Sequence, residues 1–132
     1  MNGEWTNIPY NYDLSEFNGI SFHAKSDTKL SLKFYILDNW LNTHHWQTIF
    51  VIEPSSDWQV FKLPFTDFIK VDQKNGTVIK DGSEQKRSNF VSFNIMHSEV
   101  HHIEEDGEAV ANKDYNKEKP FCWHFENFHA YK

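Results

Sequence analysis

Histidine and carboxylate side chains gather in one polar segment late in the chain. The segment supplies both kinds of side chain that bind divalent metals: His97, Glu99, His101, His102, Glu104, Glu105 and Asp106. Imidazole nitrogens and carboxylate oxygens together can hold zinc or a related ion. The sequence lacks a His-Glu-x-x-His motif, and we expect residues 97–119 to form a solvated excursion with surface histidines. A metal-dependent enzyme is therefore one hypothesis among several.

Other patterns of catalytic chemistry are absent from the sequence. There is no Gly-x-Ser-x-Gly nucleophile motif, no phosphate-binding glycine loop and no dinucleotide-binding glycine pattern. Asp38 and Glu53 could be imagined as the carboxylate pair of a glycosidase, but nothing in the sequence sets the distance between them. We therefore predict a domain with no catalytic activity of its own.

The composition favours β-structure. Of 132 residues, 17% are aromatic, namely 12 Phe, 5 Trp and 5 Tyr, whereas only 12 are Ala, Leu or Met. Aromatic and β-branched side chains prefer strands, so this balance argues against a helical bundle and a doubly wound α/β fold. A chain of this length is expected to form one domain, residues 1–132.

Charge and hydropathy exclude several classes of partner. The formal net charge of −6 is the wrong sign for sequence-independent nucleic-acid binding. No apolar run approaches the roughly 18 residues of a membrane span, and the N-terminal residues do not resemble a signal peptide. The single cysteine, Cys122, excludes a disulfide within the chain.

Apolar and polar residues alternate with a period of two along most of the chain. This alternation predicts strands at residues 17–25, 30–38, 45–53, 58–63, 90–96 and 121–131. The strand at 45–53 is apolar on both faces toward its end, which indicates a central position in a sheet. Residues 69–88 should form a long excursion with a small hairpin, one arm of which is residues 77–80. The predicted fold is all-β, an antiparallel β-sandwich or jelly roll.

Four short blocks then resemble known families. They are Asp13–Lys25 with its D-L-S-x-F-x-G-I-x-F pattern, Asp57–Phe68 with W-Q-x-F-x-L-P-F-x-D-F, Phe90–Ile95, and His124–Phe128. Their order resembles carbohydrate-binding modules of the galactose-binding-like jelly-roll type, most nearly the family-11-like modules. The chain is also similar to the complex I assembly protein family, whose members carry a long insertion after the P-F-x-x-F element, as here at residues 69–88.

The resemblance to carbohydrate-binding modules implies a site for a polysaccharide, such as a β-glucan, on a concave sheet face. Such a site needs aromatic platforms and paired polar groups for sugar hydroxyls. The predicted ligand-binding residues are Tyr35, Trp40, His45, Trp46, Gln47, Asn94, Met96 and His124. Alternation alone also allows that this face is the solvated side of the sandwich, and that Trp46 lies in the core beside Phe50.

The same resemblance implies further properties. Glu126 could ligate a structural calcium ion, and the module would belong to a larger secreted protein, which places it outside the cell. Trp58 and Trp123 are expected to pack in the core, while Trp5 suits either an exposed platform or an edge cover. The resemblance to assembly proteins implies instead a protein-interaction domain with no glycan binding.

Overall fold

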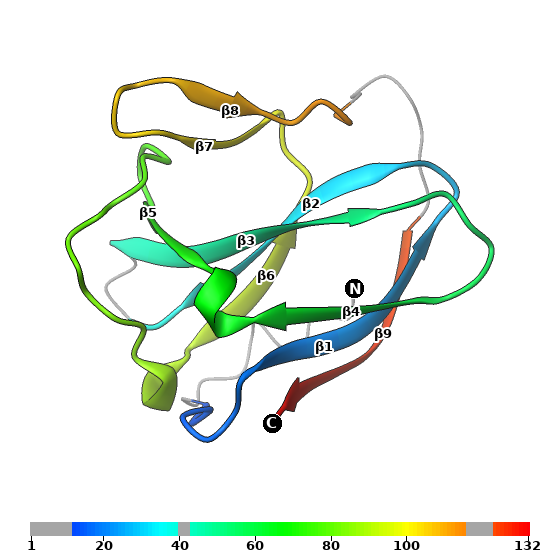
Figure 1. Cartoon of the computed structure of the whole chain (residues 1–132), viewed down its shortest axis with the longest axis horizontal. Helices are drawn as coiled ribbons and strands as arrows, with labels where there is room; N and C mark the ends of the chain where they lie inside the picture. The colour runs from blue at the N-terminus through cyan, green and yellow to red at the C-terminus, as the bar shows by residue number, and fades with distance from the viewer. Residues whose placement is uncertain (1–11, 40–42, 116–122) are drawn as a thin grey trace.

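The computed structural model describes residues 12–39, 43–115 and 123–132 (Figure 1). These ranges contain nine strands: β1 (Gly19–Ser26), β2 (Leu30–Leu37), β3 (His44–Ile52), β4 (Gln59–Pro64), β5 (Ile69–Asp72), β6 (Ser92–Met96), β7 (Val100–Ile103), β8 (Ala109–Ala111) and β9 (Trp123–Tyr131). Two short 3-10 turns, η2 (Phe65–Asp67) and η3 (Arg87–Asn89), precede β5 and β6. Within those ranges, no helix is long and apolar enough to span a membrane.

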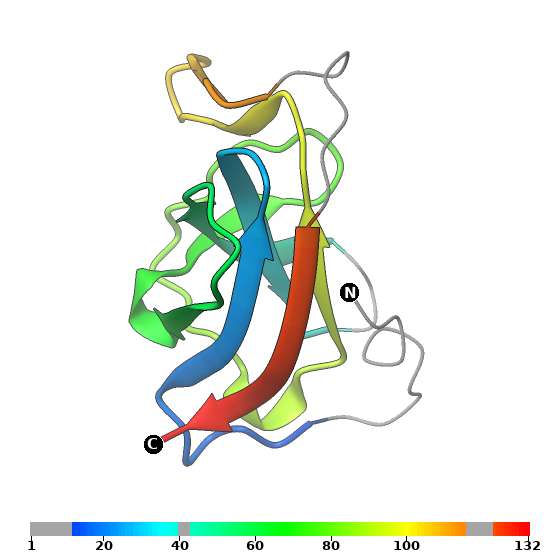
Figure 2. The same ribbon diagram turned by 90° about the vertical axis from the view of Figure 1, so that its right-hand side faces the viewer.

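Two antiparallel sheets pack face to face. One has three strands in the order β4-β1-β9, and the other has four in the order β5-β3-β2-β6 (Figures 1 and 2). The prediction of an antiparallel β-sandwich is confirmed, and this arrangement is compatible with a jelly roll. The predicted central position of the strand at 45–53 is also confirmed, because β3 lies between β5 and β2.

Phenylalanine fills the space between the sheets. Phe22, on β1, is fully buried; its ring stacks on Phe34 at 5.8 Å and on Phe128 at 5.0 Å between centroids. The edge of Phe50 meets the same ring at 5.1 Å. Alternation along β1 and β2 sends one set of apolar side chains inward, which is why the period of two located these strands correctly.

A bulge in β9 places two rings in the core that simple alternation would separate. Phe125 and Phe128 are three residues apart, yet both pack against Phe22, at 5.9 and 5.0 Å. Asn127, between them, has a positive φ of 59°, and the β1–β9 register shifts at the same place. The extra residue resets the alternation so that both rings face inward.

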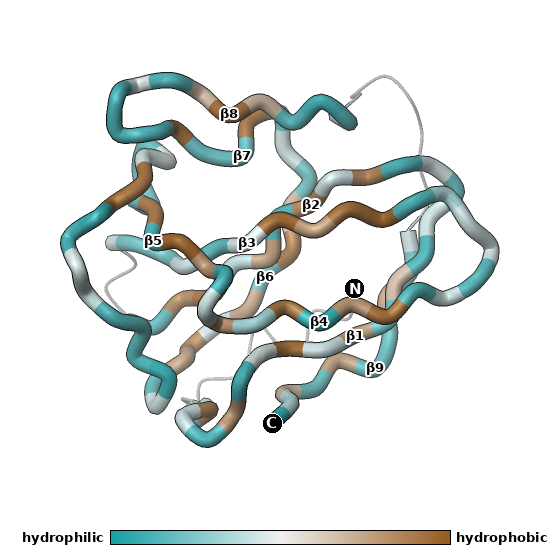
Figure 3. Tube along the Cα trace, in the orientation of Figure 1, coloured by the Kyte–Doolittle hydropathy of each residue, from teal (hydrophilic) through white to brown (hydrophobic). Residues whose placement is uncertain are grey.

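The two long excursions are more ordered than the sequence indicates. Residues 97–119 were expected to be solvated, but those that the structure describes contain the β7–β8 hairpin, whose strands include hydrophobic as well as hydrophilic residues (Figure 3). The predicted arm at 77–80 forms single bridges, Val71 with Val78 and Thr77 with Ile103. These bridges link the hairpin through residues 76–78 to β5, so both excursions become part of one folded layer.

Gly19 marks the closest approach of β1 to its two neighbours. A Cβ atom there would lie 2.4 Å from the carbonyl oxygen of Leu63 and 2.6 Å from the hydroxyl of Tyr131. We expect Gly19→Ala to lower the free energy of unfolding by about 2 kcal/mol, because the Leu63 backbone must move. Gly82→Ala is the control, since it meets no atom within 4 Å and carries only the strain of a φ of 75°. Equal urea midpoints for the two variants would contradict this account.

Candidate functional site

Three of the predicted site residues form one row across the four-stranded sheet. Tyr35 of β2 is paired with Gln47 of β3 on one side and with Asn94 of β6 on the other. His45 belongs to the same outer face, and its ring lies 4.7 Å from that of Tyr35. The structure therefore places these side chains on one face of the sheet, as the alternation of residues along each strand predicts. Met96 completes the face one row away, opposite Lys33 of β2.

This outer face is covered by the chain itself. Gln47 is only 1% exposed, and its Nε2 donates to the carbonyl oxygen of His101 in β7 at 2.9 Å. Asn112, just after β8, donates from Nδ2 to the carbonyl oxygen of Ser31 at 2.8 Å. Lys33 Nζ donates to the carbonyl oxygen of Val100 at 3.3 Å. The β7–β8 hairpin thus occupies the position where a polysaccharide was expected.

His45 is held within a buried hydrogen-bond network. Its Nε2 lies 2.8 Å from Oε1 of Gln47, and its Nδ1 contacts Oε1 of Gln73. Burial lowers the pKa of His45, against the raising effect of the two amide hydrogen bonds and with a further lowering by the Lys33 charge. Because its ring nitrogens are already engaged, His45 serves here to fix the sheet to neighbouring loops.

His101 lies at the base of the hairpin under similar conditions. Burial lowers its pKa, and the nearby charge of Lys33 lowers it further, while the Asp114 carboxylate opposes both. Its Nδ1 is buried with no hydrogen-bond partner among the described residues. A neutral imidazole tolerates this buried position better than a charged one.

Trp46 lies in the core and not on a binding face. Its Nε1 donates to Oδ2 of Asp38 at 2.9 Å, beneath the segment that carries Lys86. This burial corrects its place among the predicted ligand-binding residues, and it follows from the alternation that Trp46 shares with Phe50. Trp40, the other predicted tryptophan, lies outside the described residues.

Asp38 is a buried carboxylate at the end of β2. It accepts the backbone N–H of Lys86 at 2.9 Å, Nδ2 of Asn39 at 3.3 Å and the Trp46 indole, and it lies 2.9 Å from Nε2 of His44. Burial alone would raise the pKa of Asp38, but these hydrogen bonds and the His44 charge outweigh it and lower the pKa. Asp38 and Glu53 lie at opposite ends of the β2–β3 pair, so they form no carboxylate pair.

His124 does not belong to the predicted face. It lies on β9, opposite Lys25 in the three-stranded sheet, and is exposed on the other side of the sandwich. Alternation fixed its phase within its own strand, but it could not assign that strand to a sheet. Glu126, on the same strand, lies 3.4 Å from Nδ1 of His23.

Metal-capable side chains are dispersed in this structure. In the part of the chain that the structure describes, no three His, Cys, Asp or Glu residues are grouped so that they could hold a metal ion. The histidine-rich segment instead pairs His102 with Glu104, at 3.1 Å between Nε2 and Oε1. The calcium ion proposed for Glu126 stays a prediction.

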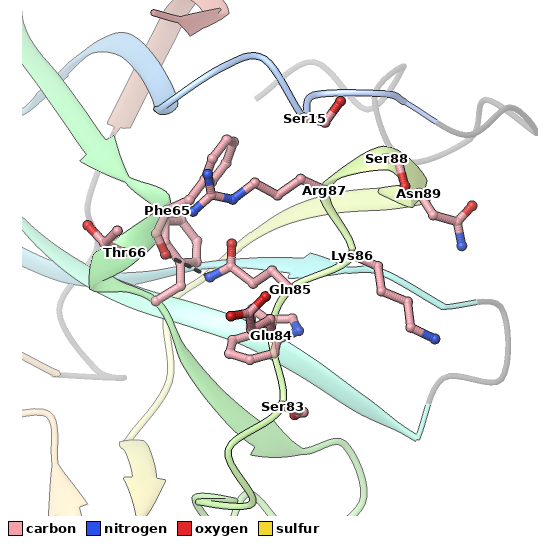
Figure 4. A pocket seen from close by; sticks show the side chains of 12 residues that line it. Ser15, Phe65, Thr66, Ser83, Glu84, Gln85, Lys86, Arg87, Ser88 and Asn89 are labelled. Atoms are coloured by element: carbon pink, nitrogen blue, oxygen red, sulfur yellow. Dashed lines mark hydrogen bonds between the residues drawn. The ribbon is translucent and has the colours of Figure 1, made fainter.

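A pocket of about 710 Å³ lies between η2 and residues 83–89 (Figure 4), and no motif in the sequence predicts it. Gln85 Nε2 donates to the carbonyl oxygen of Phe65 at 2.7 Å, and the Arg87 guanidinium lies over the Phe65 ring at 5.2 Å. The pocket is lined by aromatic rings of the core and by hydroxyl groups and charged groups of both signs. These contacts mainly pack residues 83–89 against the sandwich.

Comparison with protein families identifies the chain. The family described as Complex I intermediate-associated protein 30 (CIA30) matches residues 4–121. The chain belongs to the CIA30 family. No curated protein and no solved structure matches it.

Membership of CIA30 corrects the functional interpretation of the sequence. The prediction of a carbohydrate-binding module is wrong, since the family that matches is the assembly family named as the alternative. The structure of this CIA30 chain agrees with that correction. The predicted sugar-binding face is covered, because Gln47 and His45 bind other segments of the same chain. The similarity to carbohydrate-binding modules lies in the β-sandwich, and a shared fold does not carry a shared function.

The Asp38 network should contribute to the stability of the CIA30 chain, and this contribution should depend on pH. An asparagine amide has one acceptor oxygen in place of two, so Asp38→Asn can no longer accept from all of the donors around it, among them the Trp46 and Lys86 N–H groups. We expect the free energy of unfolding to fall by about 3 kcal/mol. Folding lowers the pKa of the Asp38 carboxyl, so its charged form stabilises the folded protein at pH values above the pKa of the unfolded chain. This stabilisation disappears as the pH falls through the pKa of the folded state. Urea unfolding at neutral pH and below about pH 4 measures both effects.

The exposed carboxylate Asp57 provides the control for this measurement. Asp57→Asn should leave the neutral-pH stability almost unchanged. An Asp38→Asn protein as stable as Asp57→Asn at neutral pH would show that the network is not needed.

Asn112 should hold the hairpin against the sheet. Its side chain donates to the carbonyl oxygens of Ser31 and Ser98, at 2.8 and 2.9 Å, so Asn112→Ala leaves buried acceptors unsatisfied. We expect amide exchange in β7 and β8 to become at least about tenfold faster, with the core strands unchanged. Asn94→Ala, which removes only a bond to Ser92, is the matched control and should not accelerate exchange there.

Proposed function

We propose that this CIA30 chain is a non-catalytic protein-interaction domain that associates with an intermediate in the assembly of complex I. The observation that carries the proposal is the family match over residues 4–121, because the family is described by that association. An assembly domain needs a stably folded surface that contacts another protein, and it needs no cleft for a small substrate.

The architecture supports this proposal. The hairpin forms hydrogen bonds with the outer face of the four-stranded sheet, and the Asp38 network ties residue 86 to the end of β2. Several large apolar side chains are nevertheless exposed: Val51, Trp58, Val60, Ile69, Met96 and Val100. Of these, Trp58 and Val60 are two residues apart at β4, and neighbouring exposed apolar side chains are typical of interaction surfaces. The extracellular location and the larger secreted enzyme were tied to the carbohydrate interpretation, and neither is proposed for the assembly role.

The proposal is tested in cells of the organism that makes the chain. The tagged protein is followed by two-dimensional native electrophoresis, and complex I is quantified after the gene is deleted. We expect the tagged chain to migrate with complex I subunits in a particle smaller than the finished complex, and deletion to reduce finished complex I several-fold. Normal complex I in the deletion strain, together with a tagged chain that migrates alone, would overturn the proposal. The Gly19→Ala variant, which we expect to be less stable, is the control that shows how far a weakened fold alone reduces complex I.

A further inference from the structure

Trp58 is exposed although its block predicted a core position. It lies just before β4 and is 40% exposed, and Val60, two residues on, is 63% exposed. Residues two apart in a strand point to the same side. Both side chains therefore project from the outer face of the three-stranded sheet. We call this outer face of β4, β1 and β9 the Trp58 face.

Cationic side chains flank the rings of this face. Lys25 Nζ lies over the Trp58 ring at 4.5 Å from its centroid, and Lys62 Nζ lies over the Tyr131 ring at 5.3 Å. These contacts hold two ammonium groups and two rings in defined positions before any partner arrives. Tryptophan and tyrosine are enriched among the residues that contribute most to binding at protein interfaces.

Basic groups outnumber acidic ones on the Trp58 face. His23 lies between Val60 of β4 and Glu126 of β9, while His129 lies across from Ser21 and His124 across from Lys25. Among the described outward side chains of the three strands, two lysines and three histidines thus accompany one carboxylate, Glu126. With histidines counted as neutral, these three strands present two lysines against one carboxylate on this face, whereas the whole chain has a formal charge of −6.

One cluster of acidic side chains lies on the other side of the molecule. The turn between β7 and β8 carries Glu104, Glu105, Asp106 and Glu108. Figure 1 shows the hairpin beyond the four-stranded sheet, with the three-stranded sheet on the opposite side of the sandwich. A negatively charged partner is therefore directed toward the Trp58 face and away from the hairpin.

A recess adjoins one end of the Trp58 face. Its volume is about 500 Å³, and it is lined by Lys25, Ser26, Asp27, Ser55, Ser56 and His124. The ammonium and imidazole groups, together with serine hydroxyls, suit a carboxylate oxygen, while the Asp27 carboxylate in the lining disfavours a group of high negative charge such as a phosphate. The recess thus favours a single acidic side chain next to the apolar pair of Trp58 and Val60.

We propose that the Trp58 face docks an acidic, partly apolar segment of a partner protein. An apolar side chain of the segment covers Trp58 and Val60, and a carboxylate enters the recess between Lys25 and His124. This inference rests on the proposed function as an interaction domain and specifies the surface and the chemistry of the partner. The edge of β4 carries Lys62 and Pro64, which disfavour simple strand addition, so side chains must supply the specificity.

The first test uses defined peptides and the full chain. The probes are fluorescent peptides of about ten residues that alternate Leu with Glu, and matched peptides that alternate Leu with Gln. We expect the acidic peptide to bind about tenfold more tightly at low salt, and added salt to remove most of that difference. Equal binding of the two peptides would overturn the assignment of an acidic partner.

The variants locate the binding face. Val60→Glu and Lys25→Glu should each weaken binding of the acidic peptide about tenfold, since each places a negative charge where the segment docks. Val51→Glu is the matched control, because Val51 is exposed at 38% on the outer face of the other sheet. Because Val60 and Val51 are both exposed, both substitutions should leave the fold intact. Equal effects of Val60→Glu and Val51→Glu would overturn the location.

The same variants separate this inference from the proposed function. If the wild-type chain migrates with complex I subunits but Val60→Glu migrates with them equally well, the Trp58 face is wrong and the assembly role stands. If the wild-type chain binds the acidic peptide at this face but not complex I subunits, the assembly role is wrong and the face stands. Self-association in sedimentation experiments that Val60→Glu abolishes would overturn the assignment to a different protein, because a second copy would then be the occupant.

Discussion

The central strands β2 and β3 are covered on both faces, and this constraint shapes the rest of the molecule. Aromatic packing against β1 buries their inner side, while the hairpin buries much of their outer side. A buried polar group without a hydrogen bond costs about 1–3 kcal/mol, so the outer side chains must find partners within the chain. The Gln47 side chain donates to the His101 carbonyl oxygen, and Lys33 donates to the Val100 carbonyl oxygen. On the inner side, Asp38 accepts the Lys86 N–H and the Trp46 indole N–H.

The same constraint explains why the resemblance to carbohydrate-binding modules indicated the fold and not the function. The blocks that carry the resemblance encode core positions of a β-sandwich, such as Phe22 and Phe65, which any member of the architecture needs. Function depends on what lies over the outer face. In this CIA30 chain that face binds its own hairpin, and the exposed aromatic side chain Trp58 lies on the opposite sheet.

Much of the fold could be predicted because strand alternation is local. Each of β1, β2 and β3 lies within two residues of its predicted bounds, and the row formed by Tyr35, Gln47 and Asn94 was found by phase alone. Part of the site could not be predicted, because alternation assigns a side chain to a face of its strand but does not say which sheet the strand joins. His124 was misplaced for that reason, and the docking of the hairpin on the sheet was missed because its contacts with β2 and β3 join residues far apart in sequence.

The sequence by itself determined that this protein is an antiparallel β-sandwich with a phenylalanine core and a central third strand. Those features follow from composition and a period of two, which act between neighbouring residues. Only the tertiary structure decided that residues 97–112 close one face, that a bulge at Asn127 brings Phe125 and Phe128 to the same side, and that Trp58 stays exposed. Each depends on hydrogen bonds and contacts between distant segments, whose free energies exist only once the sheets have assembled.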